Sequence, residues 1–149
     1  MARLQFDGIG SIEGHLLLPK GTYAFEIDSI DPNYKSKDKG SRAMRMKLHV
    51  IEGVDFEDGT STVGMEKTMD LWFPTPAQSD GGASCGRRFV ELAAACGIPG
   101  AVTFDKESKV LAVEDTDLFV SQRFVVTVAH RDYNGQPQED FKNYKAYTA

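Results

Sequence analysis

Three segments in the first half of the chain alternate apolar and polar residues with a period of two, and this pattern constrains the fold most. They are residues 21–30, 41–51 and 63–73. Because successive side chains of a β-strand point to opposite faces, each segment predicts a strand with one face on a core. The predicted inward side chains are Tyr23, Phe25, Ile27, Met44, Met46, Leu48, Val50, Met65, Met69, Leu71 and Phe73. Lys67 breaks the inward pattern, which indicates a position near an open edge.

One helix is predicted from about Ser84 to Cys96. Its apolar residues repeat at the i, i+3, i+4, i+7 spacing of an amphipathic helix. Ser84 is the predicted N-cap, and Gly97 followed by Pro99 predicts the end of the helix. The residues of the apolar stripe are Phe89, Leu92, Ala93 and Cys96.

The second half of the chain predicts two more strands, in residues 119–133 and 139–147, joined by the turn NGQP. Residues 102–117 allow a short hairpin without specifying one. Three strands, a helix and two strands is the order of the OB-fold, although other small barrels and α+β sheets share it. We therefore expect a mainly β protein, an OB-fold-like five-stranded Greek-key barrel with one helix between strands 3 and 4. Its 149 residues fit one domain, with residues 1–18 as an N-terminal arm.

The chain contains no apolar run of about 18 residues, so no membrane span is predicted. Its N-terminus, MARLQFDGIG, lacks the apolar core of a signal peptide. Cys85 and Cys96 would lie about three turns apart on the predicted helix, too far for a disulfide. Free thiols suit a reducing compartment, so we expect a cytoplasmic protein, in the host cell cytoplasm if a phage encodes it.

The usual catalytic motifs are missing from the sequence. The three histidines have no zinc-binding spacing, and neither GxSxG nor the phosphate-binding GxxxxGK[ST] occurs. The acids of residues 52–58 fall in one turn, where a solvated acidic loop is the usual explanation. We expect no catalytic residue, no metal and no cofactor, and hence no enzyme.

Positive charge concentrates in residues 34–50, although the chain has a formal net charge of −5. In an OB-fold this segment would form the first hairpin loop and the start of strand 2, and residues 130–137 would form the opposing loop. Single-stranded nucleic acid needs cations along its phosphates and aromatic faces for its bases. The predicted DNA-binding residues are Tyr34, Lys35, Lys37, Lys39, Arg42, Arg45, Lys47, Trp72, Arg131 and Tyr133.

Each of these residues also has a structural explanation. A lysine-rich loop is usually only solvated, and Trp72 near a strand end packs against a neighbouring loop as often as it is exposed. Arg45 and Lys47 could instead pair across the sheet with acids of the third strand, such as Asp70 or Glu66. Tyr133 could cap the barrel.

The segment LPKGTYAFEIDSIDPNYKSKDKGSRAMRMKLHVIEG resembles short bacteriophage proteins that open with a Pro-Gly-Tyr strand, continue with a lysine–glycine loop, and form an amphipathic MKLHV strand. Some such families are assigned or suspected as OB-fold single-stranded DNA-binding proteins of phage replication and recombination. The resemblance extends loosely over residues 19–147. The ending NYKAYTA differs from the acidic tail of bacterial single-strand binding proteins, so no partner recruitment through it is expected. The matching residues are Pro19, Gly21, Tyr23, Ser36, Lys37, Lys39, Gly40, Met46, Leu48 and Val50.

The leading hypothesis is a non-catalytic, largely sequence-independent single-stranded DNA-binding protein, able to form homo-oligomers. A second hypothesis is a protein-interaction module, for example a phage structural or accessory protein, that uses exposed β edges and the apolar arm segment HLLLP. A third is an OB-type carbohydrate binder, which would use the aromatic residues but hardly need the lysines.

Overall fold

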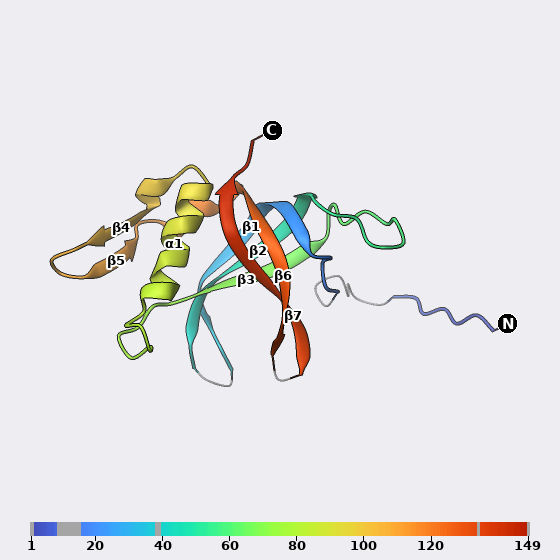
Figure 1. The fold of residues 1–149 in the computed structure, drawn as a ribbon, viewed down its shortest axis with the longest axis horizontal. Helices are drawn as coiled ribbons and strands as arrows, with labels where there is room; N and C mark the ends of the chain where they lie inside the picture. The colour runs from blue at the N-terminus through green and yellow to red at the C-terminus, as the bar shows by residue number, and fades with distance from the viewer. Residues whose placement is uncertain (1, 9–15, 38–39, 134, 149) are drawn as a thin grey trace.

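Five antiparallel strands form the main sheet in the computed structural model, which describes residues 2–8, 16–37, 40–133 and 135–148. The order across the sheet is β3-β2-β1-β6-β7 (Figure 1). The strands are β1 (Gly21–Lys35), β2 (Arg42–Glu52), β3 (Glu66–Trp72), β6 (Arg123–Tyr133) and β7 (Gln136–Ala146). The helix α1 (Ala83–Ala95) follows β3, as predicted, and among the described residues no helix is long and apolar enough to cross a membrane.

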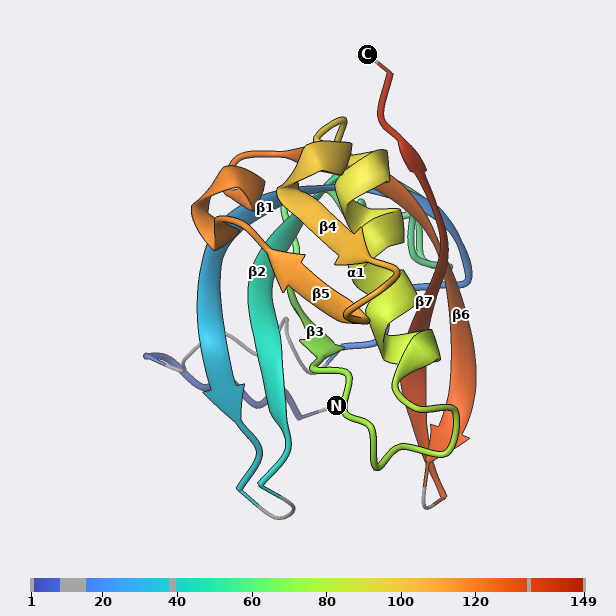
Figure 2. The same cartoon turned by 90° about the vertical axis from the view of Figure 1, so that its left-hand side faces the viewer.

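A second, two-stranded sheet follows the helix. It consists of β4 (Val102–Asp105) and β5 (Val110–Val113), between the short 3-10 helices η2 (Pro99–Ala101) and η3 (Thr116–Phe119). The sequence allowed this hairpin but did not specify it. It projects from the side of α1 that faces away from the main sheet (Figures 1 and 2).

The period-two alternation correctly predicted which side chains of β1, β2 and β3 form the core. All the predicted inward residues are buried except Phe73, which is half-buried against the core. β1 is longer than predicted, so Tyr34 and Lys35 lie in the strand and not in the loop. Beyond Ile27 this strand pairs only with β2. The register shifts between Asp31 and Tyr34 allow it to contain Pro32, which has no amide proton to donate.

The predicted apolar stripe of α1 is buried, but the predicted cap is wrong. Gly82, with φ of 90°, occupies the N-cap position and forms no side-chain cap. The carboxylate of Asp80 accepts hydrogen bonds from the amides of Ser84, at 2.8 Å, and Gly82, at 3.0 Å. A left-handed residue at Gly82 therefore brings Asp80, and not Ser84, to the helix start. Gly97, with φ of 75°, ends the helix as predicted.

The expected closure into a barrel is not observed, because no backbone ladder joins the described parts of the edge strands β3 and β7. Side chains connect them instead. Lys67 Nζ of β3 lies 3.0 Å from Glu139 Oε2 of β7, with exposed side-chain fractions of 3% and 11%. The hydroxyl of Tyr144 donates to Met69 Sδ at 3.7 Å. The helix α1 packs against both edge strands, beside this junction (Figure 2).

The end of the predicted arm is fixed to the same junction. The amide of Leu18 donates to Glu139 Oε2 at 2.6 Å, and its carbonyl contacts His130 Nε2 at 2.7 Å. Lys67 also donates to the carbonyl oxygen of Leu16. Leu18 is fully buried in the protein's own core, whereas Leu16 of the same HLLLP segment is 43% exposed.

Replacing Lys67 with Met should destabilise the fold by about 3–5 kcal/mol, because Glu139 would keep a buried, unpaired charge. The double variant K67M/E139Q should regain more than about 1 kcal/mol, since glutamine is neutral and still accepts from Leu18. Urea unfolding measures both. The control K145M, at an exposed position of β7, should stay within about 0.5 kcal/mol of wild type. Equal destabilisation of K67M and K67M/E139Q would contradict the role given to the ion pair.

The two cysteines are free, as predicted, and they differ in accessibility. Cys85 is half-buried, whereas burial raises the pKa of the Cys96 thiol to about 12. Because the thiolate is the reactive species, an alkylating reagent at neutral pH should modify Cys85 and leave Cys96 intact until the protein unfolds. Mass spectrometry of the native protein after alkylation checks this. Modification of Cys96 without unfolding would contradict the packing described for the end of α1.

Candidate nucleic-acid interface

Two aromatic residues lie beside each other on the outer face of the sheet. Tyr34 and Trp72 both pair with Ala43 in the strand register, from its two sides. Their ring centroids are 6.5 Å apart, with the planes inclined at 60°. Ala43 is fully buried although it points away from the core, because the two rings flank it. The sheet thus fixes an aromatic pair at the loop end of β1, β2 and β3.

Arg45 fixes the tyrosine of this pair. Its guanidinium forms two hydrogen bonds of 2.8 Å to the carboxylate of Asp70, and its Cζ lies 3.4 Å from the centre of the Tyr34 ring. The hydrogen bonds to Asp70 raise the pKa of Arg45 above its ordinary value. The cross-strand pairing considered from the sequence is therefore present. Arg45 holds Tyr34 in place, and its own charge is compensated by Asp70.

The other predicted cations near this end of the sheet are more available. Lys35, Lys37, Arg42 and Lys47 are exposed, and no ion pair in the described parts of the chain involves them. Arg42 donates at 2.8 Å to the side-chain oxygen of Asn33, which is neutral. In the strand register Lys47 faces Ser29 and Thr68 and not an acid. Lys39 lies outside the described residues.

A pocket of about 540 Å³ adjoins Trp72. It lies between the β1–β2 hairpin and the loop after β3, and Arg42, Trp72, Phe73 and Gln78 contribute to its wall. Gln78 donates to the carbonyl of Phe73 at 3.2 Å and accepts from the amide of Thr75 at 3.3 Å. Sequence reasoning missed Phe73 and Gln78 as wall residues; the proline-rich stretch PTPAQ after the third strand was the only available signal.

The second predicted loop is less closely associated with the aromatic pair. Arg131 is exposed on β6 and pairs in register with Gln138. The ends of β1 and β6 lie at the same end of the molecule in two perpendicular views (Figures 1 and 2). No described contact joins Arg131 to Tyr34 or Trp72. The side chain of Tyr133 lies outside the described part of the structure.

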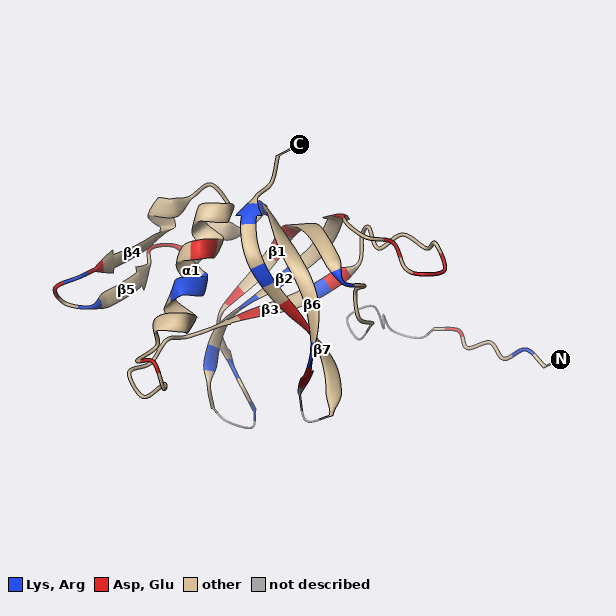
Figure 3. Ribbon diagram, viewed as in Figure 1, with Lys and Arg blue, Asp and Glu red and all other residues tan. Residues whose placement is uncertain are grey.

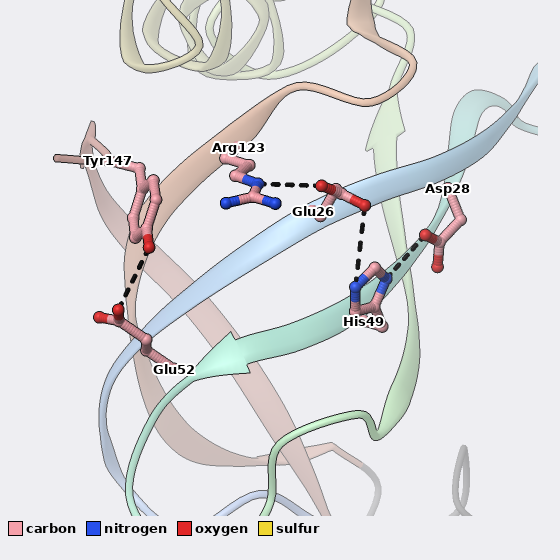
Figure 4. A network of polar contacts seen from close by, with 6 residues as sticks. All are labelled: Glu26, Asp28, His49, Glu52, Arg123 and Tyr147. Atoms are coloured by element: carbon pink, nitrogen blue, oxygen red, sulfur yellow. Dashed lines mark hydrogen bonds and ion pairs between the residues drawn. The ribbon is translucent and has the colours of Figure 1, made fainter. Parts of the chain in front are cut away.

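A network rich in acids lies on the same face where β1 begins and β2 ends, opposite the aromatic pair. Figure 4 shows this network from close by. His49 Nδ1 lies 2.7 Å from Asp28 Oδ1, and its Nε2 lies 3.8 Å from Glu26 Oε2. Arg123 Nε contacts the other oxygen of Glu26 at 2.9 Å. Sequence reasoning did not bring these residues together, since they come from three strands.

The same network contains the donor atoms of a potential metal site. One ligand atom each from Glu26, Asp28 and His49 lies within 4.8 Å of the others. However, Arg123 already compensates the charge of Glu26, and Asp28 already contacts the imidazole. This arrangement therefore favours a structural ion-pair network over a cation site. The outer face thus carries uncompensated cations near the β1–β2 loop, beside the exposed Asp31, and a larger group of acids at the far end (Figure 3).

The chain matches no protein-family model, and a comparison with curated proteins finds no significant match.

Proposed function

We propose that the protein binds single-stranded DNA without catalysis and largely without sequence preference, at the loop end of β1, β2 and β3. The observation that carries this proposal is the Tyr34–Trp72 pair beside a pocket that contains Arg42. Stacking platforms combined with backbone-tracking cations are the usual means of binding single strands. Here the platform rests on strands, so its geometry is fixed before the ligand arrives.

The individual side chains would have different roles. Trp72 offers a surface for base stacking next to the pocket, whereas Arg45 covers one face of Tyr34. Lys35, Lys37 and Arg42, together with Lys47, would contact phosphates. Both polar groups of Gln78 are engaged with the backbone, so this residue is poorly placed to distinguish bases. This favours binding that depends little on sequence.

The negative charge at the opposite end of the sheet also favours a DNA site near the β1–β2 loop. Asp28, Glu52 and Glu66, which contact no lysine or arginine in the described structure, would repel phosphates, and the repulsion would direct a strand toward the β1–β2 loop. The overall charge of −5 is therefore compatible with local binding, because salt screens charges beyond roughly 8–10 Å.

The fold assignment and the biological context form part of this proposal. A curved five-stranded sheet whose edges meet through side chains is consistent with an open OB-fold, which binds oligonucleotides on this region of its surface. The β4–β5 hairpin is additional to the five strands of an OB-fold. A role in phage replication or recombination rests on the resemblance of residues 19–147 alone.

Titration with an oligonucleotide of about 30 thymidines should quench the fluorescence of Trp72, the only tryptophan. Each stacked base should contribute about 1–3 kcal/mol. With four phosphate contacts, the logarithm of the binding constant should fall with the logarithm of salt concentration with a slope of about −3. Absence of quenching, together with absence of a gel shift at low salt, would contradict the proposal and favour the interaction-module hypothesis.

The triple variant K35A/R42A/K47A should bind the same oligonucleotide roughly a hundredfold more weakly at about 0.1 M salt, because each lost phosphate contact removes about 0.7 from the salt slope. The slope itself should decrease in magnitude by about 2. Fluorescence anisotropy with a labelled oligonucleotide measures both quantities.

The matched control is K20A/K142A/K145A, which removes three exposed cations that lie outside the proposed site. Circular dichroism verifies that both variants are folded. If the two triple variants lost affinity equally, the binding would be a general charge effect and the site would be misplaced.

A further inference from the structure

A second concave surface lies between α1 and the β4–β5 hairpin, and it shares Thr75 with the wall of the pocket beside Trp72. It is a groove of about 790 Å³ between α1, the β4–β5 hairpin and residues 74–82. Arg87 of the helix and Lys106 and Lys109 of the hairpin line it, and none of the described residues lining it is acidic. Val90 and Phe104 also line it and are 46% and 55% exposed. The groove is therefore complementary to a segment that carries both acids and apolar side chains.

This chain itself contains such a segment, residues 53–60, which we call the acidic turn. In the sequence VDFED, Val54 and Phe56 alternate with the acids Asp55 and Glu57. Val54 is 38% exposed, and both of these acids are exposed.

The acidic turn is ordered by its own hydrogen bonds. The amide of Phe56 donates to the carbonyl of Thr60 at 2.9 Å, and the amide of Thr60 donates to Asp58 Oδ1 at 2.9 Å. The hydroxyl of Thr62 donates to the carbonyl of Val54 at 2.9 Å. An ordered turn loses little conformational entropy on docking, which favours binding.

The groove and the acidic turn lie at opposite ends of the molecule, so one copy cannot bring its own two surfaces together (Figure 1). We propose that the groove binds the acidic turn of a second copy of this chain, head to tail. Such a contact is heterologous, because it joins two different surfaces. Each bound pair leaves one groove and one turn free, so association continues into a ring or an open row of copies.

The apolar lining is the reason to prefer a polypeptide over nucleic acid in this groove. Phe104, Val90 and Leu111 lie among the three cations. A base could stack on Phe104, but the aliphatic Val90 and Leu111 offer no aromatic face to a base, whereas they pack well against an apolar side chain of a polypeptide. Val54 of the acidic turn supplies an exposed apolar group between acids. Among the described residues the groove and the pocket beside Trp72 share only Thr75, and no cation lines both, so the two proposals can fail separately.

The test is sedimentation velocity at low salt without DNA, which reports association alone. The average mass of the wild-type protein should rise with concentration. The variant K106E/K109E should associate at least about tenfold more weakly, because like charges would face each other across the contact. The control K142E/K145E makes the same change in net charge at exposed positions of β7 and should associate as the wild type does.

A charge exchange makes the test specific. D55K/E57K changes only acids of the turn that make no described hydrogen bond, and it should also associate at least about tenfold more weakly on its own. Mixing it with K106E/K109E should restore association, because each altered surface then meets its complement.

Three outcomes would overturn the inference. They are a wild-type protein that stays monomeric up to about 0.1 mM, a mixture that fails to associate, and unchanged association of K106E/K109E. Oligonucleotide affinity measured on the same variants identifies the alternative occupant. If K106E/K109E lost DNA affinity and kept its association, the groove would belong to nucleic acid and not to a second copy.

Discussion

The ion pair between Lys67 and Glu139 is the interaction on which the shape of this protein depends. It joins the two edge strands of the sheet in the absence of a backbone ladder between them. A buried charge pair stabilises a fold only when its remaining hydrogen-bonding groups are satisfied. Here Leu16 and Leu18 supply those partners, so the residues before β1 complete the junction.

The curvature set by this junction determines where the outer face can act. The helix α1 packs against both edge strands, so the face that displays Trp72 remains uncovered by it. On that face, some cations of β2 form ion pairs with neighbouring strands and others do not. Arg45 is compensated by Asp70 and orders Tyr34, whereas Lys47 and Arg42 remain without an ionic partner in the described structure. The proposed binding surface would depend on the cations that have no ionic partner, and not on the total number of cations in residues 34–50.

The β4–β5 hairpin gives the molecule a second surface that the five-stranded plan does not require. It places cations and exposed apolar residues at one end, while the acidic turn lies at the other (Figures 1 and 3). A protein with modest affinity for single strands per copy gains from contacts between neighbouring copies, because linked sites bind more tightly than separate ones. Head-to-tail association would therefore suit the proposed function, although neither depends on the other.

The sequence by itself determined the local structure. The alternation of apolar residues specified the first three strands and their inward faces, and the stripe ending at Gly97 specified the helix, because these patterns depend only on the periodicity of one element. The tertiary structure alone decided that Lys67 meets Glu139, that Asp80 serves the helix start, and that Arg45 is compensated by Asp70. Local patterns determine whether a segment forms a helix or a strand and which of its faces is buried. They carry little information on the register between strands or the course of a loop. Which charges are paired and which remain available for a ligand therefore followed only once the strands were assembled.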